Sequence, residues 1–101
     1  MADKWADYVL TAVRYNAAQT HIDAVQARPD NGSKLGAPSE MTRNEVLAML
    51  DRGYSFMTAY LRKGKWQRGA TVHKVEIDRE PWIRSDPDRI EADNLGELPR
   101  L

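Results

Sequence analysis

One short segment near the middle of the chain carries a complete set of helix signals, and it limits what the rest can form. Thr42 is a typical N-cap residue, and Glu45, three positions later, completes a capping box. Gly53 supplies the left-handed position at which helices commonly end. Between these signals the apolar residues form one stripe, made of Val46, Leu47, Met49 and Leu50. The sequence predicts a helix over Arg43–Arg52. Being short, it must pack this stripe against other structure.

The segments on either side of this helix have the composition of β-strands. Tyr8–Tyr15 is rich in β-branched and aromatic residues and apolar on both faces, which predicts a central strand covered on both sides. A weaker strand is expected over Thr20–Arg28, ended by Pro29. After the helix, three further strands are predicted, over 54–61, 66–78 and 81–84. Gly69 marks a bulge or bend within the second of these.

The predicted fold class is α+β, in the order β-β-α-β-β-β. Short connections favour neighbouring antiparallel strands, so we expect an antiparallel sheet of about five strands with one helix packed on one face. Strong curling into a partial barrel is a variant of this arrangement. The second face needs cover from such curling, from the C-terminal tail or from a second subunit. Alternation within 66–78 predicts a core-facing set made of Thr71, His73, Val75 and Ile77.

Length and composition set the remaining bounds. The 101 residues predict a single domain over 1–101, with a mobile, exposed loop at 29–38 rich in turn formers. An irregular C-terminal tail is expected over 85–101, pinned by Leu95, Leu98 and Leu101. Because the formal net charge is zero, no field of the whole domain attracts nucleic acid or a membrane. The absence of cysteine and of any long apolar run predicts a cytoplasmic protein with no membrane partner.

Several short motifs, taken in order, resemble DUF3892, a family of small bacterial and archaeal proteins known only as a domain of unknown function. In sequence order these motifs are Leu10-Thr11-Ala12-Val13-Arg14-Tyr15, His21-Ile22 with Val25, Thr42-Arg43-Asn44-Glu45-Val46, Gly53 with Phe56-Met57-Thr58, Trp82-Ile83-Arg84 with Asp86, and Asp93-Asn94-Leu95-Gly96 with Leu98-Pro99. The resemblance implies a shared fold and brings no established activity and no catalytic residues.

The concentrated basic patch of the chain lies in the predicted hairpin 62–68. Its basic and aromatic residues are Arg62, Lys63, Lys65, Trp66 and Arg68. Basic side chains beside an aromatic ring can hold phosphate and stack a base, which makes nucleic-acid binding one interpretation. The alternative is a solvated turn whose lysines protect a sheet edge from aggregation. The neutral net charge favours this second interpretation.

Other chemical signals are weaker. His21, His73 and Asp23 could form part of a metal site, but no close ligand spacing supports one, so neither a metal nor a cofactor is predicted. The serines lack the sequence context of a catalytic nucleophile, so no catalytic residue is predicted. Arg14 and Arg84 each lie within an apolar strand. An internal salt bridge, for example to Asp7, Asp23 or a tail acid, is favoured over ligand binding.

The sequence therefore favours a small binding or protein-interaction module without catalytic activity. The predicted contact surface consists of Tyr54, Tyr60, Trp66 and Trp82, flanked by Arg14 and Arg84. Its expected partner is an unknown protein or a second copy of the chain. The alternative function is nucleic-acid binding through the hairpin 62–68, and a small enzyme is a less favoured third.

Overall fold

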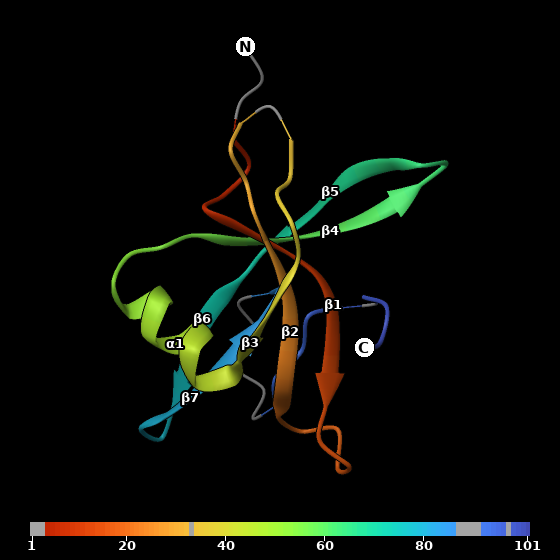
Figure 1. Ribbon diagram of the computed structural model, residues 1–101. Coiled ribbons are helices and arrows are strands. Elements are labelled where there is room, and N and C mark those ends of the chain that lie inside the picture. Colours follow the sequence, from red (N-terminus) through yellow and green to blue (C-terminus); the bar gives the residue numbers. More distant parts are fainter. Residues whose placement is uncertain (1–3, 33, 87–91, 97) are drawn as a thin grey trace.

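A computed structural model describes residues 4–32, 34–86, 92–96 and 98–101 of the chain. Figure 1 shows how the elements of this part of the chain are arranged. In chain order they are β1 (Tyr8–Tyr15), β2 (Ile22–Pro29), β3 (Ser39–Thr42), α1 (Arg43–Asp51), β4 (Phe56–Arg62), β5 (Lys65–Thr71), β6 (His73–Ile77) and β7 (Glu80–Arg84).

The helix α1 forms where its capping residues predict. The backbone N–H of Glu45 donates to the Thr42 hydroxyl at 3.2 Å, and the Thr42 N–H donates to the Glu45 carboxylate at 3.0 Å. At the other end Gly53 has a φ of 92°, and the Tyr54 N–H donates to the Met49 carbonyl at 3.0 Å. Both caps satisfy backbone groups that a helix leaves unpaired. The predicted helix is confirmed to within one residue.

The main sheet is mixed, so the prediction of a purely antiparallel sheet is wrong. Its five strands lie in the order β3-β2-β1-β4-β5, and β1 pairs with β4 in parallel, Tyr8 opposite Phe56. The other neighbours in this sheet are antiparallel. Parallel strands need a long crossover between them. Here β2, β3 and α1 together supply it and return the chain to the end of the sheet where β1 began.

The predicted strand order is also wrong, because two strands were not foreseen as separate elements. Ser39–Thr42 forms β3 at the sheet edge beside β2, just before the helix. The segment expected as one strand over 66–78 divides at Val72 into β5 and β6, and β6 pairs with β7 in a separate two-stranded sheet. In the predicted core-facing set, Val75 is buried but Thr71 is exposed. Val72, which the alternation placed on the opposite face, is buried. The change of sheet interrupts the alternation on which that prediction depended.

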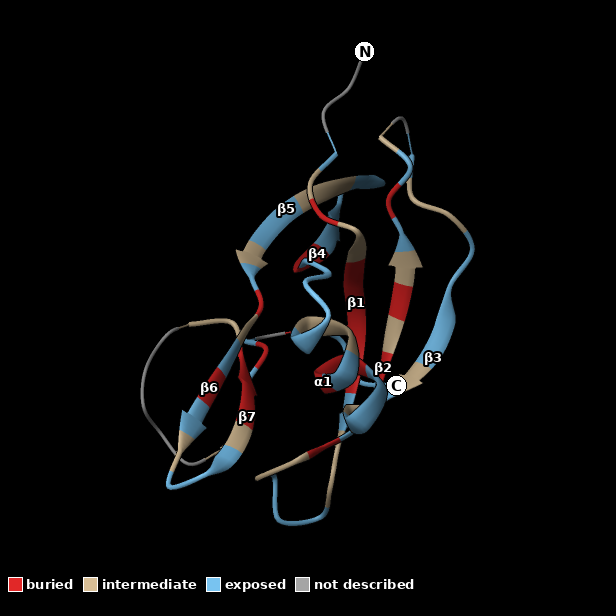
Figure 2. Ribbon diagram, turned by 90° about the vertical axis from the view of Figure 1, so that its left-hand side faces the viewer, coloured by how far each residue is buried: buried red, intermediate tan, exposed pale blue. Residues whose placement is uncertain are grey.

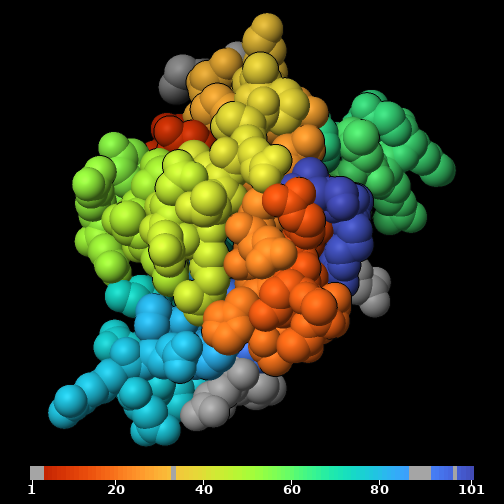
Figure 3. Space-filling model, turned by 60° about the horizontal axis from the view of Figure 1, so that its bottom comes forward, coloured from red at the N-terminus to blue at the C-terminus, as the bar shows by residue number. Residues whose placement is uncertain are grey.

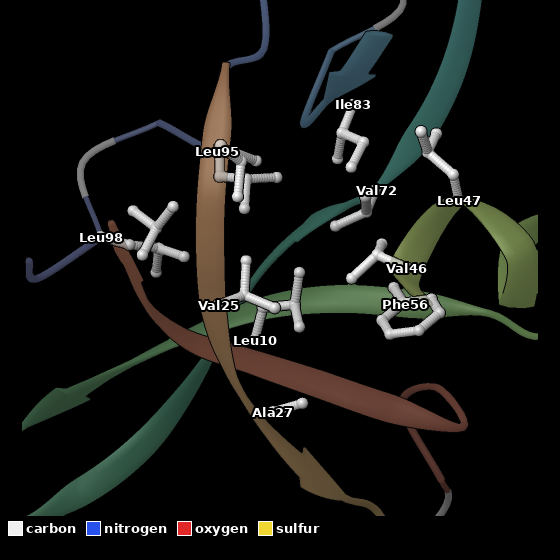
Figure 4. Packing of buried hydrophobic residues seen from close by; sticks show 12 residues of the cluster. Leu10, Val25, Ala27, Val46, Leu47, Phe56, Val72, Ile83, Leu95 and Leu98 are labelled. Atoms are coloured by element: carbon white, nitrogen blue, oxygen red, sulfur yellow. The ribbon is translucent and has the colours of Figure 1, made fainter. Parts of the chain in front are cut away.

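The hydrophobic core lies between α1, the central strands and the C-terminal segment (Figure 4). Burial is concentrated on β1, on β2 and on residues 56–59 at the start of β4. Figure 2 shows this concentration clearly on β1. Leu95 and Leu98 are buried in this core and confirm the predicted anchoring of the tail, whereas Leu101 is 44% exposed. Beyond the residues that pair with β4, β1 pairs with the tail, because the Val13 N–H donates to the Pro99 carbonyl at 2.9 Å.

The segment 29–38 is more ordered at its start than its composition predicts. Pro29 belongs to β2, and Asp30 is buried. The Asp30 carboxylate accepts hydrogen bonds from the backbone N–H groups of Trp5 at 2.7 Å and Gly32 at 2.9 Å. The expectation of an exposed loop is therefore wrong at Asp30, and the mobility of the segment stays a prediction. Within the described ranges, no helix has the length and apolarity needed to cross a bilayer.

Candidate functional site

The hairpin of β4 and β5 extends away from the body of the molecule, as Figures 1 and 3 show. Its turn is Lys63-Gly64, with φ values of 52° and 77°, and Arg62 pairs with Lys65 directly before it. Positive φ at both central residues is the signature of a type I′ turn, whose twist matches that of the two strands. This tight connection makes the arm a continuous two-stranded ribbon up to its tip.

The tip of this arm, residues 62–68, carries charge of one sign. Its cations are Arg62, Lys63, Lys65 and Arg68, and within the described part of the chain none of them forms an ion pair. No acidic residue occurs between Asp51 and Glu76. Because the whole chain is neutral, the remainder carries four net negative charges. Screening confines such fields to about 8 Å at physiological salt, so a ligand at the tip meets the local positive charge.

The two faces of the arm differ in what they present. Strand alternation places Tyr60 and Arg62 on one face, and the ladder adds their partners Gln67 and Lys65. Leu61 and Trp66 lie opposite each other on the second face. The Trp66 ring is half-buried, with the Arg28 guanidinium carbon 5.3 Å from its centroid. Tyr60 is 45% exposed, so the Tyr60 face presents the freer aromatic ring.

A groove of about 440 Å³ opens where the arm joins the body. It lies between β4, β5 and the C-terminal segment, and its lining residues are Thr58, Tyr60, Gly69, Ala70, Ser85, Leu95, Gly96 and Leu98. We call this space the Tyr60 groove. Among the polar side chains of this lining, the Thr58 hydroxyl already has a hydrogen-bond partner within the protein, because it accepts from the Ala70 N–H at 2.9 Å. The Tyr60 groove therefore combines apolar walls with few polar groups, which is typical of small-ligand sites.

The predicted bulge at Gly69 is confirmed, and it shapes this groove. The ladder of β4 and β5 shifts between Met57 and Ala59, so that Gly69 and Ala70 lie opposite the single residue Thr58. A Cβ on Gly69 would lie 2.8 Å from the Thr58 carbonyl oxygen, closer than real Cβ atoms approach. Only glycine allows this close packing without displacement of the neighbouring strand.

The predicted aromatic contact surface does not exist as one surface. Trp82 is only 5% exposed, and the Arg84 side chain is only 4% exposed. Arg84 donates to the Asp86 carboxylate at 2.7 Å and to the Ala92 carbonyl at 2.8 Å. The predicted internal salt bridge to a tail acid is thus confirmed. Neither residue is exposed enough to serve as a contact residue, because Arg84 is bonded to the tail and His21 and Arg43 pack on Trp82.

The remaining members of the predicted surface are exposed but separated. Tyr54 is 44% exposed and packs near Tyr8, with ring centroids 6.3 Å apart. It precedes β4 by two residues, whereas Tyr60 is near the far end of that strand, roughly 20 Å away in extended chain. Arg14 forms an exposed salt bridge with Glu40 of β3 at 3.0 Å. A salt bridge was expected for Arg14, but as an internal one, whereas the observed pair is exposed on both sides.

A buried cluster that sequence reasoning missed surrounds Asp93, whose side chain has no exposed area. The Asp93 carboxylate accepts from Arg43 Nε at 2.6 Å and from the backbone N–H groups of Ile22 and Ile83, both at 2.8 Å. Arg43 and His21 pack on Trp82, at 5.6 Å and 4.8 Å from its ring centroid. We call His21, Arg43, Trp82 and Asp93 the Asp93 cluster. Because it joins α1, β2, β7 and the tail, its role is structural.

Neither histidine is placed with enough partners for a metal site. The His21 ring contacts the Thr20 hydroxyl at 3.1 Å, and its Nε2 lies 3.6 Å from the Glu80 carboxylate. Asp23 is exposed on β2, and His73 begins β6. In the ranges that the structure describes, no three His, Cys, Asp or Glu side chains gather in a group able to hold a metal ion.

Fold and site together define a small α+β domain with a projecting basic hairpin and an adjacent groove. Residues 10–99 match the family described as "Protein of unknown function (DUF3892)", and the chain therefore belongs to this family. No curated protein and no solved structure matches the chain. Several motifs on which the resemblance is based, including His21-Ile22, Thr42-Arg43 and Asp93-Asn94, meet at the Asp93 cluster.

Proposed function

We propose that this protein is a small binding module that contacts nucleic acid through the arm formed by β4 and β5. The observation that carries this proposal is the group of four cations at the tip of the arm, which have no ion-pair partner in the described ranges. Tyr60 and Trp66 lie among them. Phosphates attract such cations, and bases stack on aromatic rings of this kind. The proposal involves no reaction and no catalytic residue.

The neutral net charge of the chain is compatible with this proposal because the charges are separated in space. The arm extends away from the body, and a second hairpin, formed by β6 and β7, extends elsewhere on the surface (Figure 3). Residues 76–80 at its tip carry Glu76, Asp78 and Glu80 against the single cation Arg79. Phosphate contacts made by a few cations give weak, strongly salt-dependent binding. We therefore expect modest affinity, carried by the arm alone.

A charge-reversal experiment tests the proposal. Lys63 and Lys65 are exposed at the turn, so the double variant Lys63→Glu with Lys65→Glu removes the attraction without removing packing. The matched control is Lys34→Glu with Arg52→Glu, which makes the same change of charge at exposed positions outside the arm that form no ion pair in the described ranges. Binding of labelled oligonucleotides is measured by fluorescence anisotropy between about 50 and 200 mM salt.

For the unmodified protein, log K should fall with log salt with a slope of about −3, as expected for some four phosphate contacts. The arm variant should lose at least about tenfold in affinity, and the control should retain most of it. Salt-independent binding, or equal losses in the two variants, would exclude the arm as the phosphate-binding element. Thermal unfolding of each variant checks that the fold is retained.

A second candidate function is contact with an acidic protein surface, including that of another copy of this chain. It is supported by Leu61, which is 58% exposed on the arm, and by the acidic tip of the second hairpin. Sedimentation velocity at low salt tests self-association. A species heavier than the monomer that disappears in the double lysine variant would support this candidate, and a monomer at every concentration would exclude self-association.

We also propose that the protein acts in the cytoplasm. The support is its composition, because a chain without cysteine gains nothing from an oxidising compartment. Localisation of a fluorescently tagged full-length chain tests this directly.

A further inference from the structure

The Tyr60 groove and the cations of the arm lie on one continuous strand face. Thr58 and Tyr60 line the groove, and Arg62 is the next residue of β4 on the same side. Residues two apart on a strand are about 6.6 Å apart, so Arg62 and its ladder partner Lys65 lie just beyond the rim that Tyr60 forms. A ligand in the groove would therefore reach two cations with an anionic group.

The groove lining is suited to a flat, mostly apolar ring. Ala70, Leu95 and Leu98 provide apolar walls, and the volume falls within the range of about 300–1,000 Å³ that is usual for small-ligand sites. The Ser85 hydroxyl also lines the groove and has no hydrogen-bond partner in the described part of the chain. It is free to bond the polar edge of a base. The exposed Tyr60 ring can stack on the same ligand at the rim.

From this arrangement we propose that the Tyr60 groove receives one unstacked base of a single-stranded nucleic acid, whose neighbouring phosphates lie on Arg62 and Lys65. This inference rests on the proposed function and narrows it to single strands. A paired base is stacked within its duplex and cannot enter a pocket unless it is flipped out. An acidic peptide would satisfy the two cations, but its carboxylate side chains offer no ring to the groove.

Four probes of similar length separate the contribution of the bases from that of the charge, and the duplex carries about twice the phosphate charge of the single strand. They are a single-stranded oligothymidylate of about twelve nucleotides, an abasic strand with the same phosphates, a duplex and polyglutamate. The unmodified protein should bind the oligothymidylate about tenfold more tightly than the abasic strand or the duplex. Binding of polyglutamate should be no tighter than that of the abasic strand, because charge alone carries both.

Variants of the lining residues then test whether the base binds in the groove. Ala70→Leu fills the groove, and Ser85→Ala removes the free hydroxyl with little change of volume. Both should weaken binding of the oligothymidylate and leave binding of the abasic strand within about twofold of its original value. Tyr60→Ala should likewise weaken binding of the oligothymidylate and spare binding of the abasic strand. The matched control is Tyr54→Ala, since Tyr54 has nearly equal exposure but is remote from the groove. This control should change the binding of neither strand.

The outcomes distinguish the inference from the function on which it rests. Equal binding of the base-containing and abasic strands, or equal losses for both in Ala70→Leu and Ser85→Ala, would overturn the groove assignment and leave the basic arm as a phosphate-binding element. Failure to bind any nucleic acid would overturn the proposed function. Tighter binding of polyglutamate than of the oligothymidylate would assign the arm to an acidic protein instead. Thermal unfolding confirms that each variant is folded.

Discussion

Two regions of this molecule combine arginine with tryptophan and use the combination in opposite ways. In the Asp93 cluster, the Arg43 guanidinium lies 5.6 Å from the Trp82 ring centroid, and Arg43 is held by a carboxylate with no exposed area. On the arm, Trp66 has the Arg28 guanidinium of β2 5.3 Å from its ring centroid, and the cations of the tip meet no carboxylate in the described part of the chain.

The difference shows that a carboxylate within reach decides what an arginine can do. A buried guanidinium must be paired, because removal from water costs several kcal/mol per charge. The Asp93 cluster meets this requirement internally, which makes its arginine part of the fold. The cations at the tip stay hydrated and gain little from any pairing within the protein. They are free for a ligand that brings its own negative charge.

The largest effect is expected when the buried pair is broken. Asp93→Asn removes the negative charge from the fully buried position and leaves Arg43 without its partner. The free energy of unfolding should fall by about 3–5 kcal/mol. Glu40→Gln, which breaks the exposed pair with Arg14, should cost less than about 1 kcal/mol. Urea denaturation of both variants measures the contrast, and equal losses would erase the distinction between buried and exposed pairs.

The two tryptophans offer a more direct comparison of the regions. Trp82→Ala removes a buried side chain and should destabilise the protein by about 3–5 kcal/mol. Trp66 is only half-buried, so Trp66→Ala should cost about 2 kcal/mol less and should weaken oligonucleotide binding instead. Chemical denaturation and anisotropy on the same pair of variants give both quantities. A larger loss of stability at Trp66 would show that the arm is part of the core.

The stability of the arm should depend on its backbone more than on its charges. Gly69→Ala forces a Cβ against Thr58 at the bulge, and we expect a loss of about 1–3 kcal/mol. By comparison, reversal of the charges of Lys63 and Lys65 should change stability by about 0.5 kcal/mol or less. Thermal and urea unfolding of the two variants test this order. An unchanged stability of Gly69→Ala would mean that the bulge relaxes without cost.

The smallest expected effect is a pH dependence where the arm begins. The Ser55 backbone N–H, and after it the Lys4 ammonium, hold the pKa of the Asp7 carboxyl below its ordinary value of 3.8. The stabilisation is present above pH 4 and is lost as the pH falls through the lowered pKa of the folded state. The midpoint of thermal unfolding should therefore drop less between pH 5 and pH 2 in Asp7→Asn than in the unmodified protein. If the unfolding midpoints of the two proteins fall equally with pH, Asp7 does not have this role.

The sequence by itself determined the features that local chemistry controls. The helix follows from Thr42, Glu45 and Gly53, whose capping effects act within one turn. The central strand Tyr8–Tyr15 follows from its two apolar faces, and the Gly69 bulge from the one residue type that lets two strands approach so closely. The concentration of cations at 62–68 is likewise visible in the sequence, because they are neighbours in the chain.

Only the tertiary structure decided which distant residues meet. Arg43 and Asp93 lie fifty positions apart, and no local signal announces their pairing. The parallel pairing of β1 with β4 and the change of sheet at Val72 depend on where the crossover returns the chain. Trp82 and Trp66 are the same residue type, and each has charged residues within two positions along the sequence. Trp82 is buried because His21 and Arg43, from distant parts of the chain, pack on its ring, whereas Trp66 lies on the projecting arm and is only half-buried.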